Sequence, residues 1–131
     1  MKKLLVTWII VQILFFSTAN AAIQTYEGIG EYPMTDETVD FAKNKAELSA
    51  QRDALEKIST YVKKTASMTD HELDSEEIIT ISAGILRVIE TKFLLAAADD
   101  GIIVTAFVTA EIDTDELKNL LEQAIKERKG E

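Results

Sequence analysis

The sequence has no cysteine, and this absence excludes several chemistries at once. A chain of 131 residues without a thiol cannot form a disulfide, a cysteine-containing zinc site or a cysteine nucleophile. It also has no cysteine to which a lipid could be attached. The only histidine, His71, cannot form a zinc site by itself. The folded chain must therefore be stabilised by its core or by a partner.

Positive charge is also scarce. The sequence has 14 lysine and arginine residues against 23 aspartate and glutamate residues, which gives a net charge of −9. An acidic protein repels the phosphate backbone of nucleic acids and anionic membrane surfaces. We therefore expect no nucleic-acid partner.

Only one long hydrophobic run occurs, and it lies at the amino terminus. Two lysines precede an apolar segment over 4–16, and Ala19-Asn20-Ala21 follows as a small-x-small exit. This order is typical of a secretory signal peptide over 1–21, and the apolar segment is shorter than the roughly 20 residues that span a bilayer. We predict cleavage after Ala21, export to the periplasm or the extracellular space, and no transmembrane segment in the mature chain. An uncleaved amino-terminal anchor is the alternative.

The mature chain, residues 22–131, has the size of one ordinary domain. Removal of 1–21 takes away Lys2 and Lys3 and no acid, so 12 basic and 23 acidic residues remain and the net charge becomes −11. The same cut removes the only tryptophan and two of the five phenylalanines. The core of the mature domain must then consist mainly of isoleucine, leucine, valine and alanine.

Small and apolar residues recur regularly in the first half of the mature chain. The run Ile23–Tyr32 predicts a strand that ends at Pro33, the only proline. Thr35-Asp36-Glu37 predicts the start of a helix that runs to about Lys64. Within this helix two sets of residues repeat, Phe41, Leu48, Leu55 and Val62 every seven positions and Ala42, Ala46, Ala50, Ala54 and Ile58 every four. We predict that both sets form one buried stripe.

The segment YEGIGEY raises the question whether Gly28 and Gly30 cradle a phosphate. Position 33 is proline rather than a third glycine, and Glu27 and Glu31 place negative charge beside the glycines. A phosphate loop presents backbone N–H groups to an anion, within a βαβ unit that this sequence does not suggest. We predict instead that the two glycines let the alanine-spaced helix cross the strand closely.

The second half of the chain predicts a short helix, a hairpin and a last helix. Asp74 and Glu77 fit a capping box, and Gly84 stands where a helix-ending glycine is expected. Asp99-Asp100-Gly101 is a turn signal between two strands, and Asp113 or Thr114 caps the last helix. The expected elements are a helix over 76–83, strands over 85–97 and 101–111, and a helix over 115–128.

These elements have the order β-α-α-β-β-α. An antiparallel hairpin and one further strand, packed with a long, a short and a C-terminal helix, predict an α+β two-layer fold with a small antiparallel sheet of about three strands. In the strand over 101–111, the even-numbered residues form an apolar face. On the half-polar face we expect the last helix to cover four large side chains, Ile103, Phe107, Phe93 and Leu95. Their exposure as a contact surface is the alternative.

The combined pattern resembles a family of envelope proteins. It consists of the strand YEGIGEY, the helix AKNKAELSAQRDALEK, the helix end IITISAGIL and the hairpin ETKFLLAAADDGIIVTAFVTAEID. Over about residues 23–113 it resembles the membrane-associated lipoprotein family named for its twenty-kilodalton founder, and it is similar to the amino-terminal domain of flagellar assembly protein T. The resemblance implies an exported, envelope-associated α+β module without known chemistry. No cysteine stands at the signal exit, so the resemblance does not extend to lipid anchoring, and a flagellar role is not implied for a single domain.

Two acidic clusters are candidate sites. The cluster Asp70–Glu77, with His71 inside it, offers oxygen ligands for a divalent cation, but it lacks the glycine and the regular ligand spacing of a calcium loop. A solvated loop and helix start is the simpler interpretation. The run Asp113–Glu116 could supply paired catalytic carboxylates, but a capped helix start explains the same residues. The serines lack the glycine context of a nucleophile elbow.

These observations favour a non-enzymatic exported module of the cell envelope that binds another envelope component or itself. We expect no catalytic residues, no cofactor-binding residues and no metal ligands in it. The alternative is a small acidic metal-binding protein or hydrolytic enzyme that uses the Asp70–Glu77 cluster.

Overall fold

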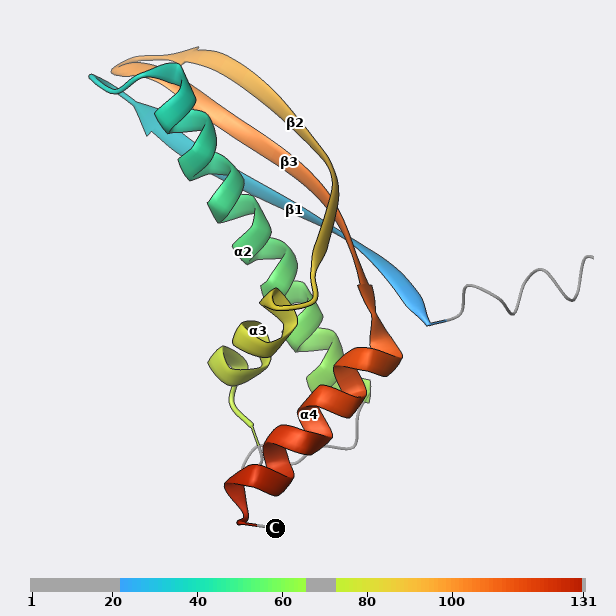
Figure 1. The fold of residues 1–131 in the computed structure, drawn as a ribbon. Coiled ribbons are helices and arrows are strands. Elements are labelled where there is room, and N and C mark those ends of the chain that lie inside the picture. The colour runs from blue at the N-terminus through green and yellow to red at the C-terminus, as the bar shows by residue number, and fades with distance from the viewer. Residues whose placement is uncertain (1–21, 66–72, 131) are drawn as a thin grey trace, which may run out of the picture.

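A computed structural model of the chain describes residues 22–65 and 73–130. The element order is β-α-α-β-β-α, as the sequence predicts. The elements are β1 (Ile23–Met34), α2 (Val39–Thr65), α3 (Ser75–Ala83), β2 (Arg87–Ala98), β3 (Gly101–Asp113) and α4 (Thr114–Arg128). The three strands form one antiparallel sheet, and α2 lies along one of its faces (Figure 1). The predicted α+β two-layer fold is therefore confirmed.

Strand β3 is the centre of the sheet, whose strand order is β1-β3-β2. It pairs antiparallel with β1, so that Gly28 lies opposite Val108, and antiparallel with β2 through the hairpin. The hairpin turn consists of Asp99 and Asp100, because Gly101 already pairs with Ala98 at the start of β3. Both outer strands, β1 and β2, are consequently sheet edges.

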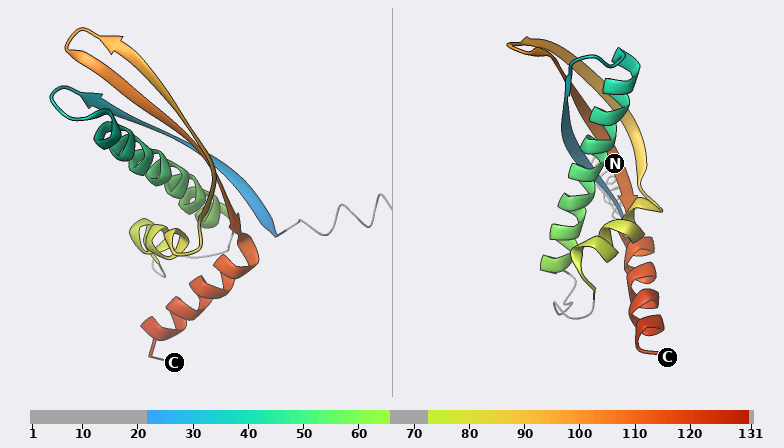
Figure 2. Two further views of the ribbon diagram at one scale, coloured as in Figure 1. Left: turned by 45° about the horizontal axis from the view of Figure 1, so that its top comes forward. Right: turned by 90° about the vertical axis from the view of Figure 1, so that its left-hand side faces the viewer.

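The two glycines of β1 lie directly against the backbone of α2. A Cβ atom added at Gly28 would lie 1.9 Å from the carbonyl oxygen of Ala50, and one added at Gly30 would lie 2.3 Å from the carbonyl oxygen of Ala46. Real Cβ atoms do not approach backbone atoms so closely, so only glycine fits at these two positions. The predicted close crossing of strand and helix is confirmed, and the helix occupies the space that an anion would need (Figure 2).

The predicted stripe of α2 is only half right. The alanine row is completely buried, and Leu55 and Val62 are buried with it. Phe41 and Leu48 are not buried, since 43% and 53% of their surfaces are exposed. Because the alanines bring the helix backbone close to the sheet, large side chains fit only beside the contact. Phe41 packs there against Tyr32, with ring centroids 5.9 Å apart.

Several element boundaries differ from the prediction, for example that of β2, which begins at Arg87 rather than at Ile85, and two of these differences have a clear physical reason. Strand β1 continues through Pro33 to Met34, which is possible because an edge strand needs no N–H on its open side. Helix α2 begins at Val39 rather than at Thr35. Its cap is Thr38, whose Oγ1 accepts a hydrogen bond of 3.2 Å from the N–H of Phe41. The residues before it form a bend instead of a first helical turn.

The core has two parts, which meet along α2. The first part packs the alanine row against the inner face of β3, and consists of Ala42, Ala46, Ala50, Val104, Ala106, Val108 and Ala110. The second part lies beyond the end of the sheet and joins α2, α3, β3 and α4 through Leu55, Ile58, Val62, Leu73, Ile78, Ile79, Ile112, Leu117 and Leu121. Because the two parts follow one another along α2, the domain is elongated (Figure 1).

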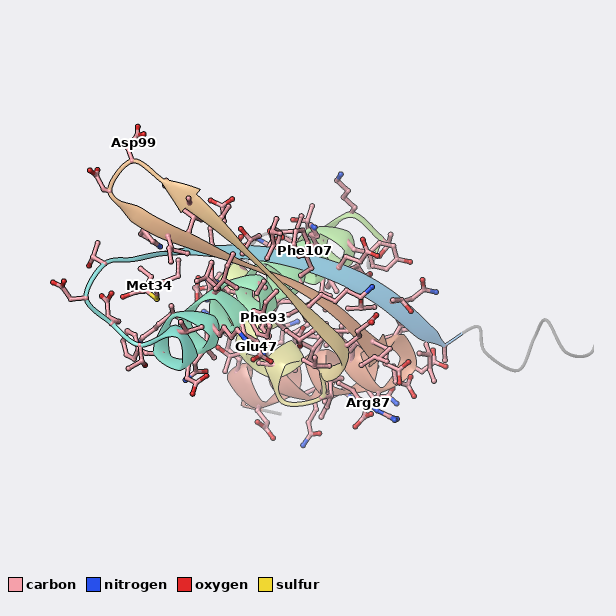
Figure 3. The ribbon with its side chains drawn as sticks, turned by 90° about the horizontal axis from the view of Figure 1, so that it is seen from above. Met34, Glu47, Arg87, Phe93, Asp99 and Phe107 are labelled. Carbon is pink, nitrogen blue, oxygen red and sulfur yellow. The ribbon has the colours of Figure 1, made fainter. Side chains whose placement is uncertain are left out.

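Helix α4 does not cover the outer face of the sheet, so this prediction was wrong. The helix follows β3 without a connecting loop, because Asp113 ends the strand and caps the helix, and it packs at the end of the sheet (Figure 1). On the outer face Phe107 is 39% exposed and Ile103 is half-buried. Leu95 is 43% exposed but lies on the α2 side, opposite the buried Val104. Phe93 is half-buried on the α2 side, beside Glu47 and away from Phe107 (Figure 3).

Candidate functional site

A groove of about 510 Å³ opens between the C-terminal half of α2 and helix α4. Its volume falls within the range of small-molecule and peptide-side-chain sites. Its buried lining consists of Ile58, Val62, Ile112, Leu117 and Leu121, and its more exposed lining of Tyr26, Tyr61, Thr65, Thr114, Asp115, Lys118, Glu122 and Ile125. The groove therefore has an apolar floor and a mixed polar rim.

Two tyrosines from different elements stand together at this groove. Tyr26 of β1 and Tyr61 of α2 meet edge to face, with ring centroids 6.4 Å apart and an interplanar angle of 65°. Burial, and to a smaller degree the neighbouring Tyr61, raises the pKa of Tyr26 above its usual value. The Tyr26 hydroxyl thus stays protonated at neutral pH and can donate a hydrogen bond, while both rings offer apolar surface.

Ala22, which directly precedes β1, is fixed beside the same groove. Both the N–H and the hydroxyl of Thr114 donate hydrogen bonds of 2.7 Å to the carbonyl oxygen of Ala22. The Asp113 carboxylate accepts hydrogen bonds from the N–H groups of Asp115 and Glu116, at 3.0 and 3.2 Å. Asp113 is therefore the helix cap that the simpler interpretation of this acidic run predicts.

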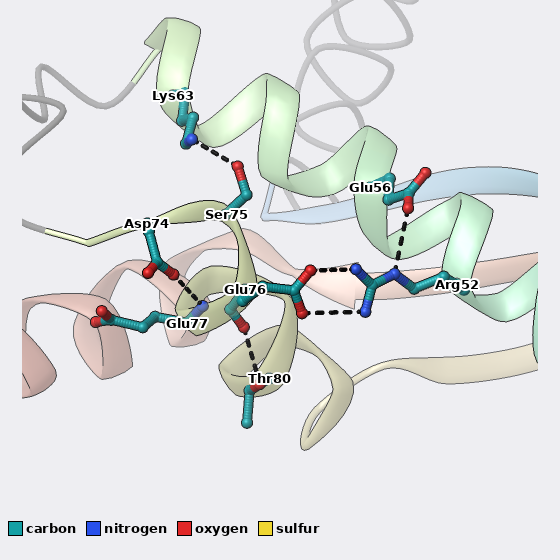
Figure 4. A network of polar contacts seen from close by, with 8 residues as sticks. All are labelled: Arg52, Glu56, Lys63, Asp74, Ser75, Glu76, Glu77 and Thr80. Atoms are coloured by element: carbon teal, nitrogen blue, oxygen red, sulfur yellow. Dashed lines mark hydrogen bonds and ion pairs between the residues drawn. The ribbon is translucent and has the colours of Figure 1, made fainter.

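The described part of the Asp70–Glu77 cluster holds α3 in place (Figure 4). Asp74 caps the helix by accepting a hydrogen bond of 2.8 Å from the N–H of Glu77. The Glu77 carboxylate does not complete the capping box, because it binds Arg128 at 3.0 Å. Glu76 binds the guanidinium of Arg52 on α2. Asp70, His71 and Glu72, the other members of the Asp70–Glu77 cluster that were considered as ligands, lie outside the described residues.

Further polar contacts join α2 to α3. Arg52 also bonds Glu56 at 3.2 Å, and these contacts, with Glu76 first, raise the pKa of the arginine. Lys63 donates a hydrogen bond of 2.6 Å to the Ser75 hydroxyl (Figure 4). Over residues 22–65 and 73–130, no three histidine, cysteine or acidic side chains are grouped so that they could hold a metal ion. The described carboxylates of this cluster thus make structural contacts.

The sequence pattern predicts only part of the groove. The spacing of Leu117, Leu121 and Ile125 predicts an apolar face on α4, and this face is found. Nothing in the spacing shows that the face is only partly covered, because this depends on the angle at which α4 leaves the sheet. Tyr26 and Tyr61 are 35 positions apart in the sequence, and only the fold brings them together.

Comparisons with known proteins add no family to this geometry. A scan against protein-family models finds no match to the chain, and a search of curated proteins finds none. Within the ranges that the structure describes, no helix is both long enough and apolar enough to cross a membrane. The family resemblance and the export signal therefore remain predictions from the sequence.

Proposed function

We propose that the mature chain is an exported, non-enzymatic module of the cell envelope that binds another envelope component. The observation that carries this proposal is the groove between α2 and α4, because an apolar floor with tyrosines at its edge is typical of a recognition site. The amino-terminal signal over 1–21 and the resemblance to the lipoprotein family support the compartment.

The charges at the groove favour a particular kind of partner. On α4, Asp115 and Glu122 lie on either side of Lys118 at the rim, and the mature chain as a whole is strongly acidic. We assign the groove to a short apolar segment of another envelope protein that carries basic residues next to its apolar side chains. The apolar residues of such a segment would fill the floor, and its basic residues would meet the acidic rim.

Site-specific photo-crosslinking in intact cells tests this proposal. A photoreactive phenylalanine analogue replaces Tyr61, which is 46% exposed and lines the groove. The matched control carries the same analogue at Asp99, an exposed position in the hairpin turn at the far end of the molecule (Figure 3). We expect position 61 to give a specific adduct with an envelope protein. Equal adducts from positions 61 and 99, or no adduct from position 61, would contradict the proposal.

A further inference from the structure

The two edges of the sheet are protected unequally. At β1, the N–H of Ile29 donates a hydrogen bond of 2.9 Å to the carboxylate of Asp53, and Lys57 donates one of 2.7 Å to the carbonyl oxygen of Glu27. Asp53 and Lys57 both belong to α2 and form an ion pair of 3.4 Å with each other. Side chains of the long helix thus occupy backbone groups that an added strand would need at this edge.

Two sequence features close the β1 edge further. Pro33 has no N–H to offer to a neighbouring strand. Glu27 and Glu31 are exposed acidic side chains on this strand, and they would face like charges if two copies met there. Proline and charge are the common means by which proteins keep an edge strand from pairing.

The β2 edge has less protection. Helix α2 packs mainly on β1 and β3. Two of its side chains contact side chains of β2. Glu47 accepts a hydrogen bond of 3.4 Å from the Thr91 hydroxyl, and the Lys43 ammonium lies 5.3 Å from the centre of the Phe93 ring. Neither contact occupies the backbone of β2. An edge strand left open in this way can accept another strand.

The composition of β2 after its bulge also favours pairing. The bulge lies between Val88 and Glu90, and the strand is regular from Glu90 to Ala98. The exposed side chains of this segment include Leu94 and Leu95, which are 55% and 43% exposed and lie on opposite faces. Its two charged residues, Glu90 and Lys92, form an ion pair of 3.6 Å with each other. The segment is therefore apolar and has no net charge, although the mature chain is strongly acidic.

We infer that β2 pairs with β2 of a second copy of this chain, so that two sheets join into one antiparallel sheet. A two-fold axis at Leu94 would place this residue opposite its counterpart, and Phe93 opposite Leu95 of the second copy. Charge disfavours two other registers. An axis at Leu95 sets Glu90 opposite Asp100, and an axis at Lys92 sets two lysines opposite each other.

A second copy fits this edge because two neutral strands can approach where two acidic surfaces repel each other. The dimer goes beyond the proposed binding function, because it adds a contact between two copies to the groove's contact with another protein. It uses a surface apart from the groove, because no residue of β2 lines the space between α2 and α4. The two proposals can therefore fail separately.

Single cysteines test whether β2 pairs with β2 of a second copy, because the chain has no cysteine of its own. Directly opposed residues of an antiparallel pair have Cα atoms about 4.5–5.5 Å apart, which a disulfide can bridge. We expect the exported mature protein with Leu94→Cys to form a disulfide dimer under mild oxidation. The matched control is Ile29→Cys, because Ile29 is also an exposed edge residue, at 52%, but belongs to β1. Equal crosslinking of the two variants would overturn the inference.

Sedimentation equilibrium tests the dimer without a crosslink. At about 100 µM we expect the unmodified mature protein to be dimeric, and Leu94→Lys to weaken the dimer by at least about tenfold. Ile29→Lys should leave it unchanged, and circular dichroism would show that both variants are folded. A monomeric parent protein, or a dimer equally affected by both substitutions, would overturn the inference. A monomer that still gives the adduct from Tyr61 would overturn the dimer alone and leave the proposed function standing.

Discussion

Replacement of Gly28 by alanine should destabilise the domain strongly, although it adds only one methyl group. The added Cβ would lie 1.9 Å from the Ala50 carbonyl oxygen and 2.9 Å from the Ala54 nitrogen, both of which are backbone atoms. Ordinary van der Waals contact begins at 3.4 Å, so the strand and the helix must separate by about 1.5 Å. No side-chain rotation can relieve this overlap.

The separation would weaken the whole alanine contact. A gap of about 0.5–1 Å already removes a quarter to a half of the dispersion energy between two surfaces. Overpacking in a core typically costs about 1–3 kcal/mol, and we expect Gly28→Ala to reach about 3 kcal/mol because rigid backbone atoms oppose it. This is a large part of the roughly 5–15 kcal/mol by which a domain of this kind is stable.

Urea denaturation followed by circular dichroism measures this effect as the free energy of unfolding. Gly84→Ala is the control, because a Cβ at this position would meet only the Ile81 carbonyl oxygen at 3.4 Å and the backbone there has an ordinary helical φ of −69°. The control should lie within about 0.5 kcal/mol of the parent protein. If Gly28→Ala also stayed within this margin, the close crossing of β1 and α2 would be refuted.

Three further predictions concern single side chains. Asp74→Ala removes the cap of α3 and should lower the free energy of unfolding by about 1 kcal/mol in the same urea assay, and an unchanged value would contradict the cap. Ser59→Ala should raise the free energy of unfolding by up to about 1 kcal/mol, because the Ser59 hydroxyl is buried without a hydrogen-bond partner among the described residues. A loss of stability would contradict this prediction. Hydrogen bonds, first of all from the Thr35 N–H, lower the pKa of Glu37 below 4.5, so its contribution to stability is complete above that pH and is lost as the pH falls through the lowered value. Glu37→Gln should therefore reduce the loss of stability in this acid range, and an acid titration with an unchanged slope would contradict it.

The sequence predicted those parts of the fold that depend on local pattern or on very small residues. The element order follows from alternation, caps and turns, and Gly28 and Gly30 indicate the close helix crossing because glycine in a strand needs a steric reason. The seven-residue repeat wrongly predicted that Phe41 and Leu48 are buried, because a helix that packs through alanine buries only a narrow stripe. The repeat describes the helix, whereas burial depends on the surface that the helix meets.

The arrangement of the last helix could not be predicted in this way. The apolar spacing of α4 is compatible with packing on the outer sheet face or at the end of the sheet, and the two differ only in the direction taken after Asp113. The groove and the exposed Phe107 both result from this direction. The unequal edges likewise depend on contacts such as that between Ile29 and Asp53, 24 positions apart, which no local pattern reveals.

The central claim, that this is an exported binding module whose contact site is the α2–α4 groove, is tested most directly by one mass-spectrometric measurement. Adducts formed in intact cells from the photoreactive positions 61 and 99 are digested, and both the bound protein and the amino terminus of the chain are identified. We predict a chain that begins at Ala22, joined from position 61 to one envelope protein that position 99 does not capture. A chain that keeps residues 1–21, or the same adducts from both positions, would contradict the claim.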